Sequence, residues 1–396
     1  MANSPHQASA QMLGYLYQVR CALDLLLSDT NERLSICLEK FDDVAFSTDG
    51  ATPAALIQTK HHVAGRGDLS DKSTDLWRTL KVWIDYIEER GLDNIKFIIV
   101  TTATSPEDSA ASLLRGSKRD ATRAYELLKA VSSDSQNKTN VPFYTAFGKT
   151  SAEKMMKLLD NVTVIDMHDN IVDVAHNIKA TLRYSARPES IENVFERVEG
   201  WWFDKIIIAL TSNEPIFITQ DEVHSRIRDI ADEYSSNNLP IDIVLQEIVD
   251  IENVPEDERV FCEQLYLIAV KETRLQLAIR DYYNAFTQRS KWVKDENLYI
   301  DELSKYENSL IGEWQRLFAQ MEDEITAEQG DAEKQKAGRD LYNAVSNMTH
   351  LSIRPKCTDA FVMRGSYHIL ANALRVGWHL EYKKMLSSKS DDGGVQ

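Results

Sequence analysis

No apolar run in this 396-residue chain approaches the roughly 20 residues that a helix needs to cross a membrane. The N-terminus, MANSPHQASAQ, has no basic segment followed by an apolar core, so we expect no secretion signal. The four cysteines are scattered and form no CxxC pair, which argues against a zinc site and favours free thiols in a reducing compartment. Together these absences predict a cytoplasmic protein with no membrane partner.

Charge is distributed unevenly along the chain. The formal net charge is −17, yet residues 1–188 hold 22 Lys+Arg against 24 Asp+Glu. Residues 189–396 hold 23 Lys+Arg against 38 Asp+Glu and therefore carry nearly all of the acidic excess. DNA would be repelled by the second half, which is better suited to meeting protein, whereas the first half can carry a local basic face.

Hydrophobic periodicity predicts two domains with a boundary near residue 188. Residues 1–188 mix helix and strand patterns and predict an α/β domain. In chain order we expect a helix over 8–27, strands over 34–40, 44–47 and 54–60, a helix over 74–90, a strand over 95–100, helices over 107–131 and 150–160, and a strand over 162–166. Residues 189–386 predict a mostly α-helical domain, and the polar tail 387–396 is expected to be disordered.

A candidate site lies in residues 39–62, EKFDDVAFSTDGATPAALIQTKHH. The acidic pair Asp42 and Asp43 precedes one short strand, and Gln58 and Lys60 end the next. Residues two apart on a strand point to the same face, so Gln58 and Lys60 share a face. Asp43 is the preferred partner of these two, because only one of two adjacent carboxylates can face the site squarely.

A carboxylate, an amide oxygen and a lysine on neighbouring strands suit metal-assisted cleavage of a phosphodiester. Asp43 and Gln58 would hold Mg²⁺ or Mn²⁺, which polarises a phosphate and lowers the pKa of a bound water. Lys60 would stabilise the charge that develops at the phosphate. An Asp followed later by QxK also arises by coincidence, and an acidic pair before a strand is often only a solvated turn. His61 and His62, next along the chain, are given no role.

This spacing resembles the D…QxK motif of the PD-(D/E)xK nucleases, in the Mrr-like form that has Gln in place of Glu. The resemblance extends upstream to GYLYQ, residues 14–18, where that family places a Glu or Gln on a helix. It implies a PD-(D/E)xK nuclease core with α-βββ-α-β order and a site made of Gln18, Asp43, Gln58 and Lys60. It also implies a divalent cation that is held weakly until DNA phosphates join, because an amide replaces a carboxylate.

Four cations recur at helical spacing within the helix expected over 107–131: Arg115, Lys118, Arg119 and Arg123. On one helix they would form a basic stripe opposite the apolar residues and could contact DNA phosphates. A solvated polar face, with Glu126 paired to Arg123, is the commoner origin of such a pattern. The stripe is therefore a DNA-binding candidate with an ordinary alternative.

Several segments of the second half resemble the C-terminal domain of ABC-three-component systems, which accompanies Lamassu-type defence nucleases. They are VEGWWFDKII (198–207), NLPIDI (238–243), AIRDYYNAFTQRSKWV (278–293), YENSLIGEWQR (306–316) and IRPKCTDAFVMRGSYHILANALRVGWHLEY (353–382). Leu380 is a small departure in the last segment, where Pro is expected after GWH. The first half resembles the endonuclease domain of CBASS effectors, so the whole chain resembles the nuclease (A) subunit of a Lamassu system.

The resemblance implies an effector endonuclease that cuts double-stranded DNA in anti-phage and anti-plasmid defence. It implies an SMC-like ATPase subunit and a small accessory subunit as partners, which would hold the nuclease inactive until foreign DNA is sensed. A double-strand break calls for two sites across the duplex, so we expect a homo-oligomer in the active form. Two alternatives stay open: a non-catalytic DNA-binding or scaffold subunit, and a stand-alone restriction-type endonuclease.

Overall fold

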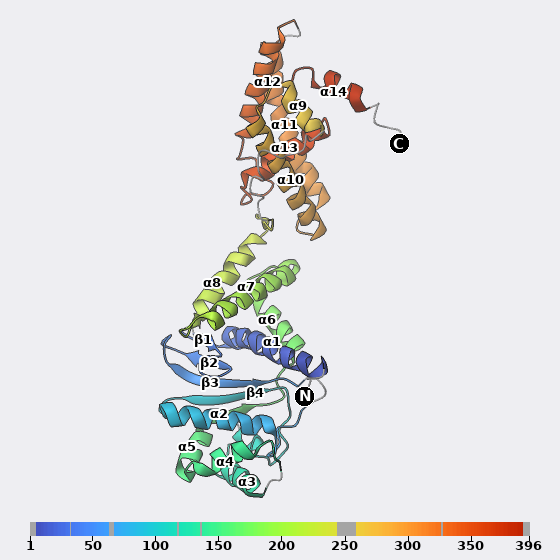
Figure 1. Ribbon diagram of the computed structural model, residues 1–396. Coiled ribbons are helices and arrows are strands. Elements are labelled where there is room, and N and C mark those ends of the chain that lie inside the picture. Colours follow the sequence, from blue (N-terminus) through green and yellow to red (C-terminus); the bar gives the residue numbers. More distant parts are fainter. Residues whose placement is uncertain are drawn as a thin grey trace. The chain divides into compact units, whose positions relative to one another are not determined.

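The computed structural model describes residues 5–31, 33–62, 67–116, 119–134, 137–243, 259–325 and 328–390. The chain divides into two compact units, Met1–Ala231 and Asp232–Gln396, whose elements are labelled in Figure 1. Among the described residues, no helix combines the length and the apolar character needed to span a bilayer.

The first unit mixes helices with short strands. Its elements in chain order are α1 (Pro5–Ser28), β1 (Ser35–Leu38), β2 (Val44–Ser47), β3 (Pro53–Lys60), α2 (Thr74–Arg90), β4 (Lys96–Thr101), a 3₁₀ turn (Ser112–Leu114), α3 (Ala121–Asp134), α4 (Val141–Lys149), α5 (Ala152–Asn161), β5 (Val162–Ile165), α6 (Ile171–Leu182), a second 3₁₀ turn (Pro188–Ser190), α7 (Ile191–Thr211), β6 (Ile218–Thr219) and α8 (Gln220–Glu233). The run from α1 to β4 has the expected α-βββ-α-β order.

The strands form one mixed sheet in the order β5-β4-β3-β2-β1-β6. β1, β2 and β3 pair antiparallel, whereas β3, β4 and β5 run parallel to one another. β4, with the sequence KFIIVT, lies between two parallel partners and is apolar almost throughout, as strands covered on both faces usually are. The carboxyl ends of β3 and β4 therefore meet at one edge of the sheet, where Lys60 pairs with Thr101.

Helices cover both faces of this sheet. One hydrophobic core joins strand residues such as Leu56, Phe97 and Val162 to the apolar sides of α2, α3, α4 and α5. Successive strand side chains alternate between faces, so Ile57 points to the opposite side, on which α1 contacts β3. Helix α1 also contacts α6 and α7, and Figure 1 shows these three helices gathered together, apart from α3, α4 and α5.

The first unit extends beyond the boundary expected near residue 188. β6 pairs antiparallel with β1 and so adds a strand to the sheet. Helix α7 is tied to α1 by a hydrogen bond from Trp202 Nε1 to the carbonyl of Val19 (2.8 Å) and by an ion pair between Arg20 and Glu199 (2.5 Å). Residues 189–231 therefore belong with the α/β unit, because an amphipathic pattern predicts a helix but does not say against which core the helix packs.

Among the described residues of the second unit, the regular elements are all helices. Its helices are α9 (Val260–Leu267), α10 (Glu272–Lys294), α11 (Ile300–Glu324), α12 (Asp331–Ser346), α13 (Ala360–Asn372) and α14 (Tyr382–Ser390). Helix α14 takes in residues 387–390, which the sequence had placed in a disordered tail. Residues 391–396 of that tail lie outside the described residues.

The single helix expected over 107–131 is wrong in its first part, and α4 and α6 were not expected. A 3₁₀ turn ends at Leu114, Arg115 is extended (φ −65°, ψ 151°), and α3 begins only at Ala121. Gly116 follows the turn, and Asp120 caps α3 through a hydrogen bond from the Arg123 backbone N to Asp120 Oδ1 (2.9 Å). A glycine followed by an Asp at the N-cap position was the sequence signal for this break.

Helices α10 and α13 approach closely at Gly365. A Cβ added there would lie 2.0 Å from the carbonyl oxygen of Asp281 and 2.4 Å from Ala285 Cβ. We expect Gly365→Ala to lower the free energy of unfolding by about 1–3 kcal/mol, because the backbone of α10 must move away. Gly312→Ala in α11 is the matched control, since its Cβ meets nothing within 4 Å and should raise stability by about 0.5–1 kcal/mol. Calorimetry should show opposite shifts in Tm, and equal shifts would contradict the close packing.

Candidate functional site

The turn between β1 and β2 is fixed by a glutamine on α1. Glu39 has a left-handed backbone (φ 56°), and its N–H donates to the carbonyl of Asp43 (3.1 Å). Gln18 Nε2 donates both to Glu39 Oε1 (2.8 Å) and to the carbonyl oxygen of Asp43 (2.7 Å). Burial raises the pKa of Glu39, although the bond from Gln18 partly offsets this. Gln18 is therefore placed to hold the turn that carries Asp43.

Asp43, Gln58 and Lys60 contact one another at the start of β2 and the end of β3. Gln58 Nε2 donates to Asp43 Oδ1 (3.0 Å), and Lys60 Nζ donates to Gln58 Oε1 (2.7 Å). Lys60 Nζ also lies 3.7 Å from Asp43 Oδ2, which accepts the backbone N–H of Thr59 (2.9 Å). The register that pairs Val44 with Ile57 brings these side chains together. The arrangement joins a carboxylate, an amide and an ammonium in one network.

Asp42 also reaches Gln58, but from the interior of the unit. Asp42 is 8% exposed, and its carboxylate accepts from Gln58 Nε2 through Oδ1 and from Trp83 Nε1 through Oδ2 (2.6 Å). Burial raises the pKa of Asp42 to about 7, against the lowering effect of the Trp83 and Gln58 bonds. Trp83 lies in the apolar stripe of α2, and that position alone is typical of a core residue with no part in a site. Thr79, also on α2, lies 3.5 Å from Gln58 Oε1.

The donor atoms of this site can hold a divalent cation only if a bound phosphate supplies further oxygen ligands. Within the described residues, no group of three or more His, Cys, Asp and Glu side chains could hold a metal ion. The Lys60 ammonium nevertheless lies between Gln58 Oε1 and Asp43 Oδ2, so positive charge is favoured at that point. Mg²⁺ commonly binds through one or two carboxylates and completes its shell with water and phosphate oxygens. Asp43 and Gln58 could hold such an ion weakly.

The four basic residues do not form a stripe on one helix. Arg115 precedes α3 and makes a two-point ion pair with Asp166, in which Arg115 Nε lies 2.8 Å from Asp166 Oδ1. Arg119 donates to the carbonyl of Leu159, and burial lowers its pKa. Lys118 lies outside the described residues. Arg123 is exposed on α3 and remains the candidate best placed to meet a phosphate.

A polar cavity of about 440 Å³ lies beyond Lys60 at the carboxyl ends of β3 and β4. Its lining includes His61, His62 and His168, together with Thr102 and acidic and amide side chains from residues 169–173. The His61 ring packs against Tyr17 with 4.7 Å between ring centroids, and the Tyr17 hydroxyl lies 2.9 Å from His168 Nδ1. Burial lowers the pKa of His61, which favours its neutral form. His61 and His62, which were given no role from the sequence, therefore line this cavity, whereas Asp43, Gln58 and Lys60 are not among its lining residues.

The family match found by comparison with known proteins lies in the second unit. Residues 261–386 match the family described as C-terminal domain 7 of the ABC-three component (ABC-3C) systems. This match supports a component of an ABC-3C bacterial defence system, and such systems work as multi-component complexes. No curated protein matches the chain.

One solved structure with some similarity is the Acinetobacter baumannii Cap4 SAVED/CARF-domain containing receptor, at 11% sequence identity and a TM-score of 0.30. The similarity covers 74% of this chain and 62% of that receptor.

The buried Asp42 carboxyl predicts a pH dependence of stability. Its pKa of about 7 in the folded chain exceeds its ordinary value of 3.8, so between these values the folded state holds a proton that the unfolded state lacks. The free energy of unfolding should therefore rise as pH falls from about 8 to 5, with a slope of at most about 1.4 kcal/mol per pH unit from this group.

Asp42→Asn should remove this part of the slope, because asparagine does not titrate. Urea denaturation at several pH values measures it, and Asp85→Asn, which changes an exposed carboxylate of α2, is the control. Parallel slopes for the Asp42→Asn variant and the unaltered chain would show that Asp42 does not take up a proton in this range.

Proposed function

We propose that this chain is the DNA-cleaving effector of a multi-component bacterial defence system. The observation that carries the proposal is the contact network of Asp43, Gln58 and Lys60 in a chain whose residues 261–386 match an ABC-3C C-terminal domain. The α-βββ-α-β order and the mixed sheet also agree with a PD-(D/E)xK nuclease of the Mrr-like type. The whole chain would then resemble the nuclease subunit of a Lamassu system.

Each residue of the network has a role in cleaving a phosphodiester. Lys60 extends an ammonium beside Asp43 and would move onto the reacting phosphate, where positive charge is needed as negative charge develops. Gln58 and Asp43 would bind Mg²⁺ or Mn²⁺, which supplies charge neutralisation and a more acidic bound water. Gln18 acts indirectly, since it fixes the turn that presents Asp43.

DNA phosphates would complete the metal shell, because the chain offers few negative ligands of its own. Bound double-stranded DNA would thus raise the affinity for the cation, and the cation would raise the affinity for DNA. The free chain would bind metal poorly and stay inactive without substrate. Two copies across a duplex would be needed for a double-strand break, so a homo-oligomer is the expected active form.

Control by partners follows from the same proposal. An SMC-like ATPase subunit and a small accessory subunit would hold the chain as a single copy until foreign DNA is sensed. The acidic second unit is suited to that docking, since it repels DNA and can attract basic protein surfaces. Release would raise the concentration of free copies and so favour assembly.

A non-catalytic DNA-binding or scaffold subunit is the second candidate. Gln58 turns its amide nitrogen, not its oxygen, towards the two aspartates, and the described residues include no cluster of three metal-binding side chains of the His, Cys, Asp and Glu types. A site that never binds metal could keep this arrangement as a purely structural network. A stand-alone restriction-type endonuclease differs from the leading proposal only in having no partner complex.

Replacing Lys60 distinguishes the proposal of an enzyme from that of a non-catalytic scaffold subunit. We expect Lys60→Ala to lower the rate of plasmid cleavage in Mg²⁺ by about two to three orders of magnitude, because the developing charge loses its partner. Lys96→Ala is the matched control, since Lys96 begins the neighbouring strand at the opposite end from the site. Cleavage that survives Lys60→Ala in a folded protein, as judged by circular dichroism, would assign the chemistry elsewhere.

Arg123 and Arg115 should behave differently in DNA binding. Arg123→Glu should flatten the plot of log affinity against log salt concentration by about one unit of slope, because one phosphate contact is lost. Arg115→Glu should instead lower stability, since Asp166 loses its ion-pair partner. Lys384→Glu in the second unit is the charge-matched control and should leave the salt slope unchanged. A salt slope that Arg123→Glu leaves intact would make Arg123 an ordinary solvated residue.

A further inference from the structure

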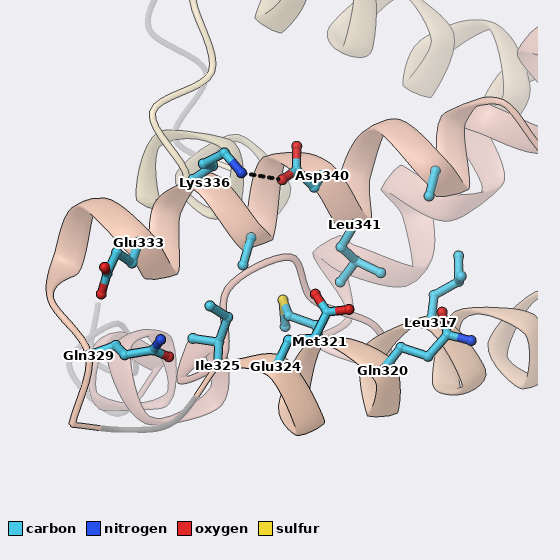
Figure 2. Close-up of a pocket in the computed structure, with 12 residues that line it drawn as sticks. Leu317, Gln320, Met321, Glu324, Ile325, Gln329, Glu333, Lys336, Asp340 and Leu341 are labelled. Carbon is cyan, nitrogen blue, oxygen red and sulfur yellow. Dashed lines mark ion pairs between the residues drawn. The ribbon is translucent and has the colours of Figure 1, made fainter.

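A groove of about 440 Å³ lies between α11 and α12 in the second unit. Figure 2 shows the two helices side by side and joined at one end, with Leu317 facing the region of Leu341, and Ile325 lying nearer Glu333. The helices therefore run in opposite directions along the groove. All of its lining residues fall within the segment that matches the ABC-3C C-terminal domain.

The floor of the groove is aliphatic and regularly spaced. Leu317, Met321 and Ile325 recur every four residues on the α11 side, and Ala337, Leu341 and Ala344 recur at spacings of four and three on α12. The two alanines are small, and Ala344 is exposed, so the floor has room above it. Two antiparallel apolar stripes are what a third helix packs against when ridges of side chains fill a groove.

The rim of the groove is acidic. It carries Glu324 from α11 and Glu333 and Asp340 from α12, against the single cation Lys336. Lys336 Nζ already lies 3.4 Å from Asp340 Oδ2, and Figure 2 draws this pair. Within the described residues, no ion pair to the exposed Glu324 is found. Glu333 Oε2 accepts a hydrogen bond from the Gly330 backbone N (3.3 Å), which leaves its charge in place, so the groove presents a net negative charge beside an apolar floor.

We infer that this groove is a docking site for an amphipathic helix of a partner protein, with aliphatic side chains on one face and Lys or Arg along its edges. The apolar face of such a helix would cover the floor, and its cations would meet Glu324 and Glu333. Helix-in-groove recognition uses anchors at helical spacing, which the stripes on α11 and α12 match. The inference is independent of whether the first unit cleaves DNA.

The negative charge of the rim argues against nucleic acid, a membrane or a second copy of this unit as the occupant of the groove. Nucleic acid and anionic membranes would be repelled by the rim, and residues 232–396 hold 29 Asp+Glu against 19 Lys+Arg. A second copy of this unit would bring like charge to the same place. A basic partner helix combines burial of the floor with attraction to the rim, so it is the occupant that both features favour.

The test uses the full-length chain and a synthetic 16-residue peptide labelled with fluorescein, whose leucines line one helical face and whose lysines flank them. Fluorescence anisotropy at low salt should show binding that is about tenfold tighter than for the same peptide with Glu in place of Lys. Ala344→Trp should fill the groove and weaken binding about tenfold, and Glu324→Lys should weaken it about threefold.

Matched controls lie on α11 but outside the residues that line the groove. Ala319→Trp and Glu322→Lys make the same chemical changes at exposed positions of α11 and should leave peptide affinity unchanged. Equal effects of Glu322→Lys and Glu324→Lys, or equal binding of the Lys and Glu peptides, would overturn the proposal. A chain dimer that sediments as such and is dissociated by Ala344→Trp would overturn it in favour of a second copy.

Discussion

The pairing register of β2 with β3 is the constraint on which the candidate site depends. Val44 lies opposite Ile57, so Asp43 emerges beside Gln58 and within reach of Lys60. A slip of one residue would turn Gln58 and Lys60 to the other face and separate the network. The alternation of β3 fixes this register from the core side, because Leu56 must face the helices α2 to α5. Packing of the core thus determines which side chains meet at the start of β2 and the end of β3.

The turn that precedes β2 is costly to form and is held by side chains outside the sheet. Glu39 adopts a left-handed backbone, and burial raises the pKa of both Glu39 and Asp42. Gln18 from α1 and Trp83 from α2 offset these costs by donating to the two carboxylates. Strained backbone and buried carboxylates that need dedicated partners are typical of functional sites, and a plain solvated turn would need neither.

Local patterns in the sequence predicted much of this arrangement. Alternation predicted β2 and β3, the apolar stripe predicted Thr74–Arg90, and the resemblance to PD-(D/E)xK nucleases placed Gln18 with Asp43. The contacts of individual side chains could not be predicted from the sequence. Asp42 and Asp43 occupy equivalent positions before the same strand, and Trp83 has the pattern of any core residue. The position of residues 189–231 was missed for the same reason, since β6 is two residues long and the helix α7 does not reveal its partner core.

The weak metal site proposed for the first unit and the acidic charge of the second unit both favour control of cleavage by partners that bind away from the site. Asp43 and Gln58 offer too little negative charge to hold a divalent cation firmly, so an incoming phosphate backbone would have to complete the shell. If the proposed function holds, such a site would be inactive without DNA and would need no inhibitor bound over it. Partners would then act through the second unit, where the acidic groove between α11 and α12 is the proposed docking site for a basic helix. Occupancy of that groove would govern how many copies are free to meet on DNA, which regulates a two-site cleavage without any change in the network of Asp43, Gln58 and Lys60.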